Sequence, residues 1–586
     1  METRWLQKER DEEAIKNLAH EAQIDELFAT ILVNRDIITL EQFNDYLNPK
    51  LKNMHDPHLL YDMDKAVSRI KKAIEDKEKI YVYGDYDVDG VTGTSVIYEC
   101  LKVLGANAFF YIPHRLKEGY GLNIDAVQHI IDEKASLVIT VDCGIRGFKS
   151  TAYAKERNLD IIVTDHHEVD PENLPQAYAI VNPKDQRGNY PFKGICGASV
   201  AFKLSWALCQ AFSPENKDKK VLPELQKFLL DAMALVAIGT VADVVPLLEE
   251  NRVVTHFGLM ALERSENVGL KALKEVSNLS QASPITPEHV GFRLGPRINA
   301  MGRMEHSRYS VELLTTKNIT TAQKLARSME VENQKRRKLQ QRIFKQALAQ
   351  MERYEYHKQN VIILADEGWH PGIIGIVASR IVEKYYRPVC IIGVENGFGK
   401  SSARSIPGFN LFQALKHCEE LLVAFGGHSM AAGFKIEADK ISAFRRKMNE
   451  FAEEILTPEH FIPSIKVDLE ITFDKIDWEF AGNIRRMSPL GEKNPPPVLI
   501  AFGVEVVMNP RPTRAGGKGE HLIFYVRQND TTFKAVFFGQ GERLDELVEA
   551  KVCDLAFSPT INTWGENHNI ELMVKDMKTP LTNQGF

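Results

Sequence analysis

The segment GDYDVDG (84–90) places three aspartates at alternate positions, and a cluster of carboxylates this dense needs a counter-charge. The acids are Asp85, Asp87 and Asp89. The pattern matches the first half of a calcium loop of the EF-hand type, which requires a glutamate at position 12 and an entering helix. Position 12 is Val96, and the preceding residues KIYVYG (79–84) are typical of a strand. The EF-hand interpretation is therefore rejected, and a different cation site is expected.

Further acids and histidines follow other short apolar runs, each of which is typical of a buried strand. The runs are KIYVYG (79–84), AFFYIP (108–113), LVITV (137–141), DIIVT (160–164) and AYAIV (177–181). Helix-like segments separate them, which predicts βαβ units and a mostly parallel sheet. Asp142 follows the third run, and Asp165, His166 and His167 follow the fourth. Because ligands bind at the carboxyl ends of the strands in such sheets, these side chains are expected to share one edge.

Asp243 ends another apolar, helix-like run, ALVAIGTVADVVPL. Taken alone, Asp243 is also compatible with a surface cap after a buried helix. It becomes a candidate metal ligand because the other acids already require a metal. Aspartate and histidine together suit Mn²⁺, Mg²⁺ or Zn²⁺ better than calcium, which prefers oxygen ligands alone. This many carboxylates make a pair of metals about 3.5–4 Å apart plausible, an arrangement that suits hydrolysis of phosphate esters.

Length and composition limit the class of protein. A chain of 586 residues predicts two to four domains, and a net charge of -6 disfavours nucleic-acid binding by global positive charge. The seven cysteines include no C-x-x-C pair, which disfavours a zinc cluster and a disulfide framework. The first residues show no apolar secretory segment, and AMALVAIGTVA (232–242) is shorter than the roughly 20 residues that span a bilayer. We expect a cytoplasmic protein without membrane association.

The second half of the chain changes character twice. Residues 320–354 lack Pro and Gly and carry apolar residues at every fourth position, which predicts one long helix of roughly 50 Å. Its QKRRK run (334–338) is interpreted as solvated surface, with nucleic-acid contact as the alternative. From about residue 463 alternating apolar runs predict a small β-barrel. Candidates there for positive charge and aromatic stacking are Arg511, Arg514, Lys518, Phe524, Tyr525 and Trp564, with about half of the aromatics expected in the core.

The motifs DYDVDG, VDCGI, TDHHE and TVADVVPL, in this order, resemble those of the DHH phosphoesterase superfamily. Further stretches resemble its RecJ family of single-strand-specific 5′→3′ exonucleases. They are YIPHRLKEGYGL (111–122), ICGASVAFKL (195–204), RLGPRINAMGRMEH (293–306), GWHPGIIGIVASRI (368–381), GKSSARS (399–405) and GGHSMAAGF (426–434). The resemblance implies an α/β fold with a parallel-sheet DHH domain, a long linker helix, a second α/β DHH-associated domain and an OB-fold barrel. The expected ranges are an N-terminal helical segment at 1–50 and domains at 51–319, 355–460 and 461–578, with the connecting helix at 320–354.

The resemblance also implies how the acids act. Two Mn²⁺ or Mg²⁺ ions would be held by Asp87, Asp89, Asp142, His166 and Asp243, with Asp142 as the bridge. Asp85 is either a ligand or an outer acid, and Asp165 is expected to orient His166, as carboxylates often do for metal-bound imidazoles. His167 is expected to meet the scissile phosphate. Tyr83 stands where related proteins often have His or a small polar residue, so the first metal could lack one ligand.

A second set of residues is expected to hold the DNA strand by its phosphates. The resemblance implies that Arg115 helps to bind the 5′ phosphate, which a planar guanidinium suits. The other members are Asn299, Arg303, Ser402, Arg404 and His428. GKSSARS is not a nucleotide-binding P-loop, because Val394 occupies the position of its first glycine.

The implied function is two-metal hydrolysis of single-stranded DNA from the 5′ end, releasing 5′-mononucleotides in recombination and repair. By resemblance, the expected partners are single-stranded DNA, a RecQ-type helicase and a single-strand-binding protein, and the protein is expected to be a monomer. Two alternatives remain open at this point. One is a DHH phosphodiesterase for short oligonucleotides or cyclic dinucleotides, and the other is a non-catalytic scaffold that binds single strands.

Overall fold

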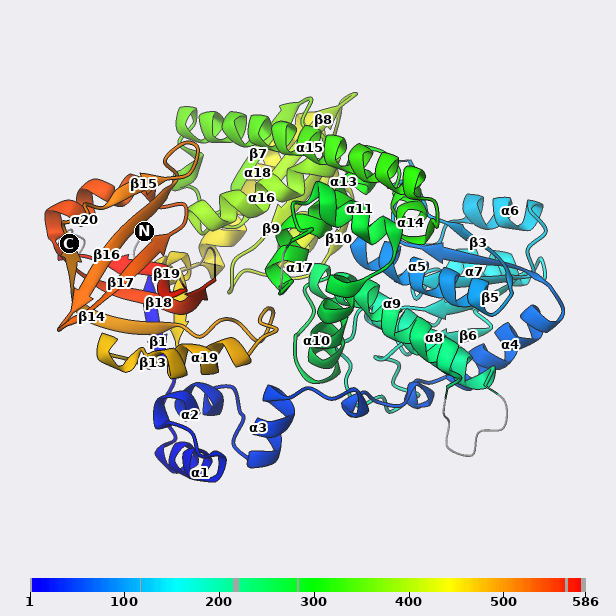
Figure 1. The fold of residues 1–586 in the computed structure, drawn as a ribbon. Coiled ribbons are helices and arrows are strands. Elements are labelled where there is room, and N and C mark those ends of the chain that lie inside the picture. Colours follow the sequence, from blue (N-terminus) through cyan, green and yellow to red (C-terminus); the bar gives the residue numbers. More distant parts are fainter. Residues whose placement is uncertain (1–2, 116, 214–220, 282–283, 564–567, 581–586) are drawn as a thin grey trace. The chain divides into compact units, whose positions relative to one another are not determined.

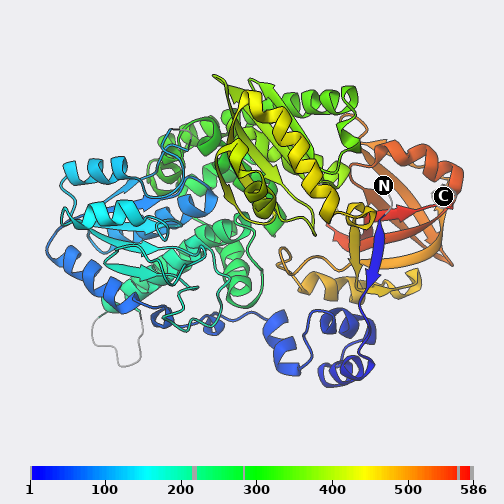
Figure 2. The same cartoon turned by 180° about the vertical axis from the view of Figure 1, so that it is seen from behind.

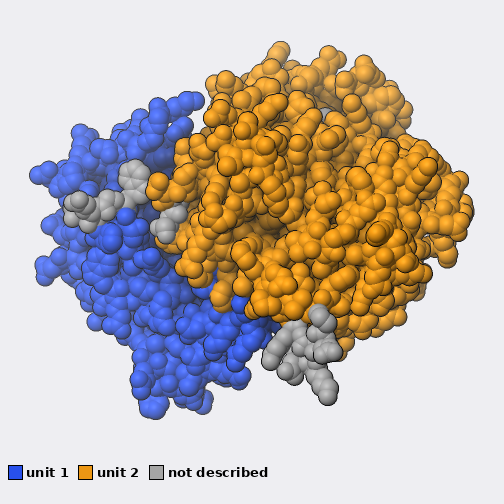
Figure 3. Space-filling view, turned by 45° about the vertical axis from the view of Figure 1, so that its right-hand side comes forward, with its two compact units in different colours: residues 1–54, 246–256, 464–586 blue, residues 55–245, 257–463 orange. Residues whose placement is uncertain are grey.

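The computed structural model describes residues 3–115, 117–213, 221–281, 284–563 and 568–580. They divide into two compact units, which Figure 3 shows in two colours. Unit 1 comprises residues 1–54, 246–256 and 464–586, and unit 2 comprises residues 55–245 and 257–463. Both α/β domains therefore lie in unit 2, together with the helix that connects them.

The first domain of unit 2 is built on a five-stranded parallel sheet in the order β3-β2-β4-β5-β6. The strands are β2 (Lys79–Gly84), β3 (Asn107–Tyr111), β4 (Leu137–Val141), β5 (Asp160–Thr164) and β6 (Ala179–Val181). Each coincides with one of the five apolar runs, within two residues at either end. The prediction of a parallel sheet is confirmed, and the central strands β4 and β5 are almost wholly buried, as their continuous apolar sequences indicate.

Helices cover both faces of this sheet (Figure 1). The helices α6 (Ile124–Asp132) and α7 (Phe148–Lys155) share one hydrophobic cluster with alternate residues of β2, β4 and β5. The helices α4 (Met63–Glu75), α5 (Val88–Val103) and α8 (Gly197–Ala211) cover the other face. Further helices of this domain are α11 (Val268–Val276), α12 (Pro287–His289), α13 (Gly295–Met304) and α14 (Arg308–Thr315), while α10 (Glu249–Arg264) begins in unit 1 and ends in unit 2.

Helix α9 (Pro223–Ala242) is the one described helix whose length and apolar composition could cross a membrane. It packs against α5 and α8, and 61% of its most apolar window is buried inside the protein. Gly239 brings α9 close to α5 and α8, since a Cβ there would lie 2.6 Å from the Thr92 hydroxyl and 2.8 Å from the Cβ of Ala198. This burial is what a core helix shows, in line with the interpretation from sequence.

The second α/β domain of unit 2 has a mixed sheet in the order β10-β11-β9-β8-β7. Its strands are β7 (Ile362–Glu367), β8 (Val389–Glu395), β9 (Phe398–Arg404), β10 (Leu422–Gly427) and β11 (Ala431–Glu437). Helices α17 (Leu411–His417) and α18 (Ile441–Ile455) pack on one face, and α18 is prominent in Figure 2. Helix α16 (Pro371–Tyr385) and the end of α15 pack on the other face.

The connecting helix α15 (Ile319–Arg353) is continuous, as predicted, and begins with Asn318 capping the amide of Thr321. The apolar residues that recur at every fourth position, including Ile343 and Ala347, are buried against α16 and β7. Within its basic run, Lys335 and Arg337 are exposed while Arg336 is half-buried. The run is therefore not uniformly solvated, because one of its guanidinium groups turns toward the protein.

Unit 1 contains a five-stranded barrel that closes because β14 pairs with both β18 and β16. The barrel strands are β14 (Leu499–Val507), β16 (His521–Gln528), β17 (Thr531–Phe537), β18 (Val552–Asn562) and β19 (Asn569–Lys578). Shorter elements flank them: β1 (Arg4–Gln7), β12 (Ser464–Val467), β13 (Leu469–Glu470), β15 (Thr513–Ala515), α19 (Trp478–Arg486) and α20 (Leu544–Ala550). This is the barrel that the resemblance implied.

The N-terminal helices α1 (Glu12–Ala22), α2 (Glu26–Val33) and α3 (Leu40–Leu47) share one hydrophobic core with the barrel. Arg252 also holds the segments of unit 1 together, because its buried guanidinium donates to the backbone carbonyls of Tyr46, Met487, Ser488 and Pro489. Of the aromatics expected to stack on DNA, Phe524 is 1% exposed and belongs to the core. Trp564 lies outside the described residues.

Candidate active site

The acids and histidines singled out by their positions converge at the carboxyl edge of the first sheet. Asp85 follows β2, Asp87 caps the N-terminus of α5, and Asp89 lies in the first turn of that helix. Potential ligand atoms form three groups, within each of which all atoms lie within 4.8 Å of one another. The groups are Asp85, Asp87 and Asp142; Asp89, His166 and Asp243; and Asp142, His166 and His167. Asp142 and His166 each belong to two of these groups, so these two side chains link all three.

Local backbone features bring these side chains together. Asp142 adopts a φ of +60°, an uncommon conformation for a non-glycine residue that is often found at functional sites. The N-terminus of α8 approaches it closely, since a Cβ on Gly197 would lie 2.6 Å from the Cβ of Asp142. Asp243 follows α9 directly, as the sequence predicted, and its side chain is about one quarter exposed. Turns and glycines thus place carboxylates from three segments around a small space.

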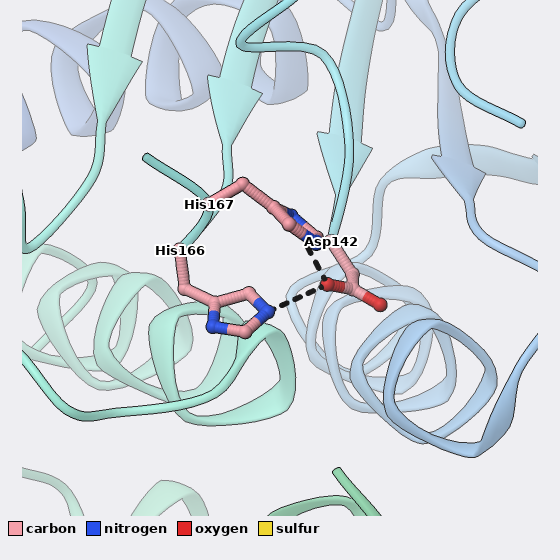
Figure 4. A group of neighbouring side chains, drawn as sticks. All are labelled: Asp142, His166 and His167. Atoms are coloured by element: carbon pink, nitrogen blue, oxygen red, sulfur yellow. Dashed lines mark ion pairs between the residues drawn. The ribbon is translucent and has the colours of Figure 1, made fainter. Parts of the chain in front are cut away.

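The ring of His166 points into this space (Figure 4). Its Nε2 lies 3.1 Å from Asp142 Oδ1, 3.7 Å from Asp243 Oδ2 and 3.8 Å from Asp89 Oδ2. The ring also hydrogen-bonds to the backbone of Ile195, and burial lowers the pKa of His166 to about 4. A neutral imidazole that donates to Ile195 presents a lone pair to three carboxylates. A cation bound between the imidazole and the carboxylates would offset the repulsion among these electron-rich groups.

The protonation of the acids leads to the same conclusion. Burial, and after it the charge of neighbouring aspartates, raises the pKa of Asp89 to about 6 and of Asp243 to about 9. The same causes raise the pKa of Asp85 and Asp142 well above the usual range. Oδ1 of Asp85 and Oδ1 of Asp142 are buried and make no hydrogen bond within the described chain. Since four aspartates and an imidazole are typical ligands of Mn²⁺ and Mg²⁺, the residues fit such ions well.

Asp89 is held by two backbone amides, together with the thiol of Cys196. Its Oδ2 accepts from the N–H of Gly197 at 2.6 Å and its Oδ1 from the N–H of Ala198 at 2.8 Å. These are the first residues of α8, whose N-cap Cys196 makes no side-chain cap hydrogen bond to the helix. The helix therefore uses its free amides to fix the orientation of a carboxylate that faces the cluster.

A second cluster, of opposite charge, lies in a cavity of about 320 Å³ formed by both domains of unit 2. Its lining residues include Arg115, Arg303, Ser402 and Arg404, with the rest on α16. Arg303 donates to the Gly372 carbonyl at 2.7 Å, and Arg404 donates to the Ala403 carbonyl at 2.8 Å. These bonds to backbone carbonyls fix the orientation of the guanidinium groups without neutralising them. The structure thus brings four residues with predicted phosphate contacts into one cavity.

Burial and the repulsion among these arginines lower the pKa of Arg303. Burial, and after it the charges of Arg115, Arg336 and Arg404, lowers the pKa of Arg303 to about 9, while Asp87 raises it. Burial and then Arg115 also lower the pKa of Arg404. Arg336, from the basic run of α15, thus contributes to this positive field. Four guanidinium groups line the cavity beside a single carboxylate, that of Glu383, and such an excess of positive charge suits an anion such as phosphate.

Comparison with known proteins assigns a family to this architecture. Family models match residues 79–238 as the DHH family N-terminal domain, 358–454 as the DHHA1 domain and 467–576 as the RecJ OB domain. The single-stranded-DNA-specific exonuclease RecJ of Bacillus subtilis is 39% identical over 575 residues, covering 98% of this chain and 70% of that protein. The chain belongs to the RecJ family.

Solved structures agree with this assignment. The RecJ of Thermus thermophilus in complex with Mn²⁺ superposes with a TM-score of 0.80 at 27% identity, covering 98% of this chain and 80% of that one. The same protein in complex with Mg²⁺ superposes with a TM-score of 0.76 at 26% identity, covering 98% and 78%. The expected combination of a DHH domain, a DHHA1 domain and an OB barrel is confirmed.

One expectation about this RecJ-family site was wrong. Asp165 does not orient the ring of His166: its Oδ1 lies 2.7 Å from Nδ1 of His167 and accepts from the backbone amides of His166 and His167. The ring of His166 is positioned by the Ile195 backbone instead. The contact with Asp165 outweighs burial in both partners, raising the pKa of His167 and lowering that of Asp165. The carboxylate therefore favours a charged His167.

Tyr83 and two of the expected phosphate residues, Asn299 and His428, belong neither to the groups of potential ligands nor to the lining of the arginine cavity. The hydroxyl of Tyr83 donates to the Gly121 carbonyl at 2.9 Å, and its ring is buried on the face that α6 and α7 cover. Asn299 lies half-buried on α13 and is not among the residues that line the arginine cavity. His428 is exposed in the turn between β10 and β11, near Glu168, whose pKa is lowered mainly by its hydrogen bond to Lys184 and less by His428.

The sequence analysis missed two polar residues near the acids of this RecJ-family chain. The hydroxyl of Tyr120 lies 3.3 Å from the Asp142 carbonyl, and its ring packs edge-on against His167. Lys184 pairs with Glu168 at 2.8 Å and lies close enough to lower the pKa of Asp243. Lys184 follows a predicted strand just as the acids do, so the same rule would have identified it as a candidate site residue. Tyr120 lies within a quoted family motif but carried no chemical signal of its own.

Proposed function

We propose that this protein is a single-stranded-DNA-specific exonuclease that removes nucleotides from the 5′ end by metal-dependent hydrolysis. One observation carries the proposal: the arginine cavity adjoins the acid cluster within one unit. Arg115 lies close enough to lower the pKa of Asp85, and Asp87 lies close enough to raise that of Arg303. A terminal phosphate held by the arginines would therefore lie beside the acids. That arrangement favours attack at the linkage next to a 5′ end.

The acid groups suggest two cation sites that share Asp142. Asp85 and Asp87 would complete one site, and Asp89, His166 and Asp243 would complete the other. The buried Oδ1 of Asp85 makes no hydrogen bond within the described chain, which favours a ligand over an outer acid. Mn²⁺ or Mg²⁺ in such sites activates water and stabilises the charge that develops on a phosphodiester.

The remaining polar residues serve the phosphate and the strand. Nδ1 of His167 faces Asp165, so its Nε2, which lies 3.4 Å from the Tyr120 hydroxyl, would face an oxygen of the scissile phosphate. Arg115, Arg303, Ser402 and Arg404 would hold the terminal phosphate, and the barrel would hold the strand further along. A barrel of this kind favours a polymeric substrate over short oligonucleotides or cyclic dinucleotides, and the complete acid set favours an enzyme over a scaffold.

The cellular setting follows from the family alone. We expect a cytoplasmic, monomeric protein that works with a RecQ-type helicase and a single-strand-binding protein in recombination and repair. Curated relatives are described as single-stranded-DNA-specific exonucleases. Size-exclusion chromatography with light scattering would check the monomeric state, and a dimer at micromolar concentration would contradict it.

The test is digestion of one single-stranded DNA with Mn²⁺, with its 5′ end and its 3′ end blocked in turn. We expect mononucleotides to appear unless the 5′ end is blocked, and a blunt duplex of the same sequence to resist digestion. Release confined to oligonucleotides of a few residues would favour a small-substrate phosphodiesterase. Tight binding of the strand without any release would support the scaffold instead.

A further inference from the structure

The arginine cavity is longer than the cluster that would hold a terminal phosphate. Helix α16 contributes one face to it through Gly375, Ile376, Ser379, Arg380 and Glu383. A Cβ on Gly375 would lie 2.8 Å from the Ser402 hydroxyl and 3.3 Å from the Arg404 guanidinium, so the helix meets that cluster at Gly375. Arg380 follows five residues later, about 7–8 Å further along the helix axis. The cavity therefore carries positive charge at two levels.

Arg380 is suited to a ligand rather than to a structural ion pair. Its guanidinium lies over the ring of Phe344 on α15, 4.3 Å from the ring centroid, which fixes its orientation. Among the residues that the structure describes, no carboxylate lies within ion-pair distance of it. The hydroxyl of Ser379 is adjacent and donates to the Gly375 carbonyl at 3.2 Å, a bond that it would exchange for one to a phosphate oxygen. A single phosphate bound beside Arg404 would therefore leave the guanidinium of Arg380 without a contact.

Glu383 marks the far end of this face, one turn beyond Arg380. Its carboxylate is the one acidic group among the lining residues of the cavity, and it would repel any anion that extended past Arg380. Along α16, the neutral Gly375 therefore comes first, the cationic Arg380 second and the anionic Glu383 last. This order matches a ligand with a short chain of negative groups that begins at Arg404 and ends near Arg380.

We propose that the cavity binds an oligophosphate, either the 5′-triphosphate end of a strand or a free inorganic chain. This inference rests on the proposed function, in which Arg115, Arg303 and Arg404 hold the phosphate attached to the first nucleoside. The second and third phosphates would then contact Ser379 and Arg380. A triphosphate end is what remains when a polymerase starts a strand from a nucleoside triphosphate. The class of reaction that supplies this substrate is therefore strand initiation without a primer.

The chemistry of the first turnover would identify such an end. Water would attack the phosphorus between the first and second nucleotides, the bond from phosphorus to O3′ would break, and O3′ would take up a proton. The first product is then a nucleoside triphosphate with a free 3′-hydroxyl, and the shortened strand begins with a monophosphate. All later products are mononucleotides. One triphosphate per strand is a readout that no other end would give.

Binding without metal tests the cavity by itself. Isothermal titration in EDTA would compare tripolyphosphate with inorganic phosphate on the full chain and on two variants, Arg380→Met and Glu383→Gln. Methionine keeps an unbranched stem over Phe344 but removes the charge. We expect tripolyphosphate to bind the native protein at least about tenfold more tightly than phosphate, since one charge-assisted contact contributes that much. Arg380→Met should abolish this difference, Glu383→Gln should increase it, and phosphate affinity should be unchanged in both.

Digestion with Mn²⁺ then separates the two sources of oligophosphate. Strands of one sequence with a 5′-triphosphate, a 5′-monophosphate or a 5′-hydroxyl would be given to the native protein and to Arg380→Met. We expect the native protein to prefer either phosphorylated end to the hydroxyl, and Arg380→Met to lose only the preference for triphosphate. Tripolyphosphate binding without cleavage of triphosphate ends would identify the free chain as the ligand.

Equal affinity of the native protein for tripolyphosphate and phosphate would overturn the inference while leaving the proposed function intact. A monophosphate end that is cut no faster than a hydroxyl end would instead contradict the proposed 5′-phosphate contact itself. The two failures are therefore distinguishable in one set of experiments.

Discussion

The acid cluster and the arginine cavity of unit 2 are built in opposite ways. The acids come from the ends of neighbouring strands and helices of one domain, and Asp142 joins two of their groups. The arginines come from segments that are far apart in the sequence and belong to two domains. Both sets gather like charges in a buried place, which is costly unless a ligand of opposite charge binds. The comparison suggests that the acid cluster depends on two shared side chains, His166 and the one shared acid Asp142, whereas the cavity depends on how two domains pack.

The largest effect is expected from breaking the acid cluster at its shared member. Asp142→Asn keeps the size of the side chain but removes the charge that lies between the two proposed cation sites. We expect activity to fall by more than the roughly 10–100-fold that follows loss of a hydrogen-bond partner of a metal ligand. Hydrolysis of a 5′-phosphorylated strand would be measured beside its binding in EDTA.

Binding of the strand to Asp142→Asn should match that of the native protein, because the arginine cavity and the barrel are untouched. Tyr83→Phe is the control, since this hydroxyl contacts the Gly121 carbonyl and should matter little for hydrolysis. Equal loss of binding and activity in Asp142→Asn would mean that the carboxylate holds the fold rather than the metals.

The two clusters also differ in how far the sequence could predict them. Parallel strands present their carboxyl ends at one edge, so the first residues after the apolar runs indicated the positions of Asp85, Asp142, Asp165 and His166. The role of Asp165 was mistaken because a turn decides which of two consecutive histidines its carboxylate meets. Arg303 lies on α13 and Arg404 on β9, so their meeting depends on how the two domains of unit 2 pack and could not be read from local sequence. Nothing in the pattern distinguished Arg336 from the exposed members of its basic run.

A smaller effect is expected from the backbone amides that hold Asp89. Ala198→Pro removes one N–H donor to this carboxylate, and proline is tolerated in the first turn of a helix. We expect Mn²⁺ affinity, followed by titration calorimetry, to fall about tenfold or more, with the free energy of unfolding lowered only modestly.

Ser199→Pro is the matched control, because it lies one position later in the same turn and its amide does not contact Asp89 in the described structure. If both proline variants lose metal affinity equally, the helix end acts through its general stability. A loss confined to Ala198→Pro would show that the amide positions the carboxylate.

The smallest effect is expected from a single methyl group in the arginine cavity. Gly375→Ala introduces a Cβ at 2.8 Å from the Ser402 hydroxyl and 3.3 Å from the Arg404 guanidinium, so both side chains must shift. We expect a several-fold loss of the preference for 5′-phosphate over 5′-hydroxyl ends, less than the roughly tenfold or greater loss of a whole guanidinium contact. Cleavage of hydroxyl ends should not change, because the acid cluster does not contact Gly375. Gly482→Ala serves as control, since its Cβ would meet nothing within 4 Å. If Gly375→Ala slows cleavage of 5′-triphosphate, 5′-monophosphate and 5′-hydroxyl ends equally, the cavity affects the acid cluster itself and does not act only on the terminal phosphate.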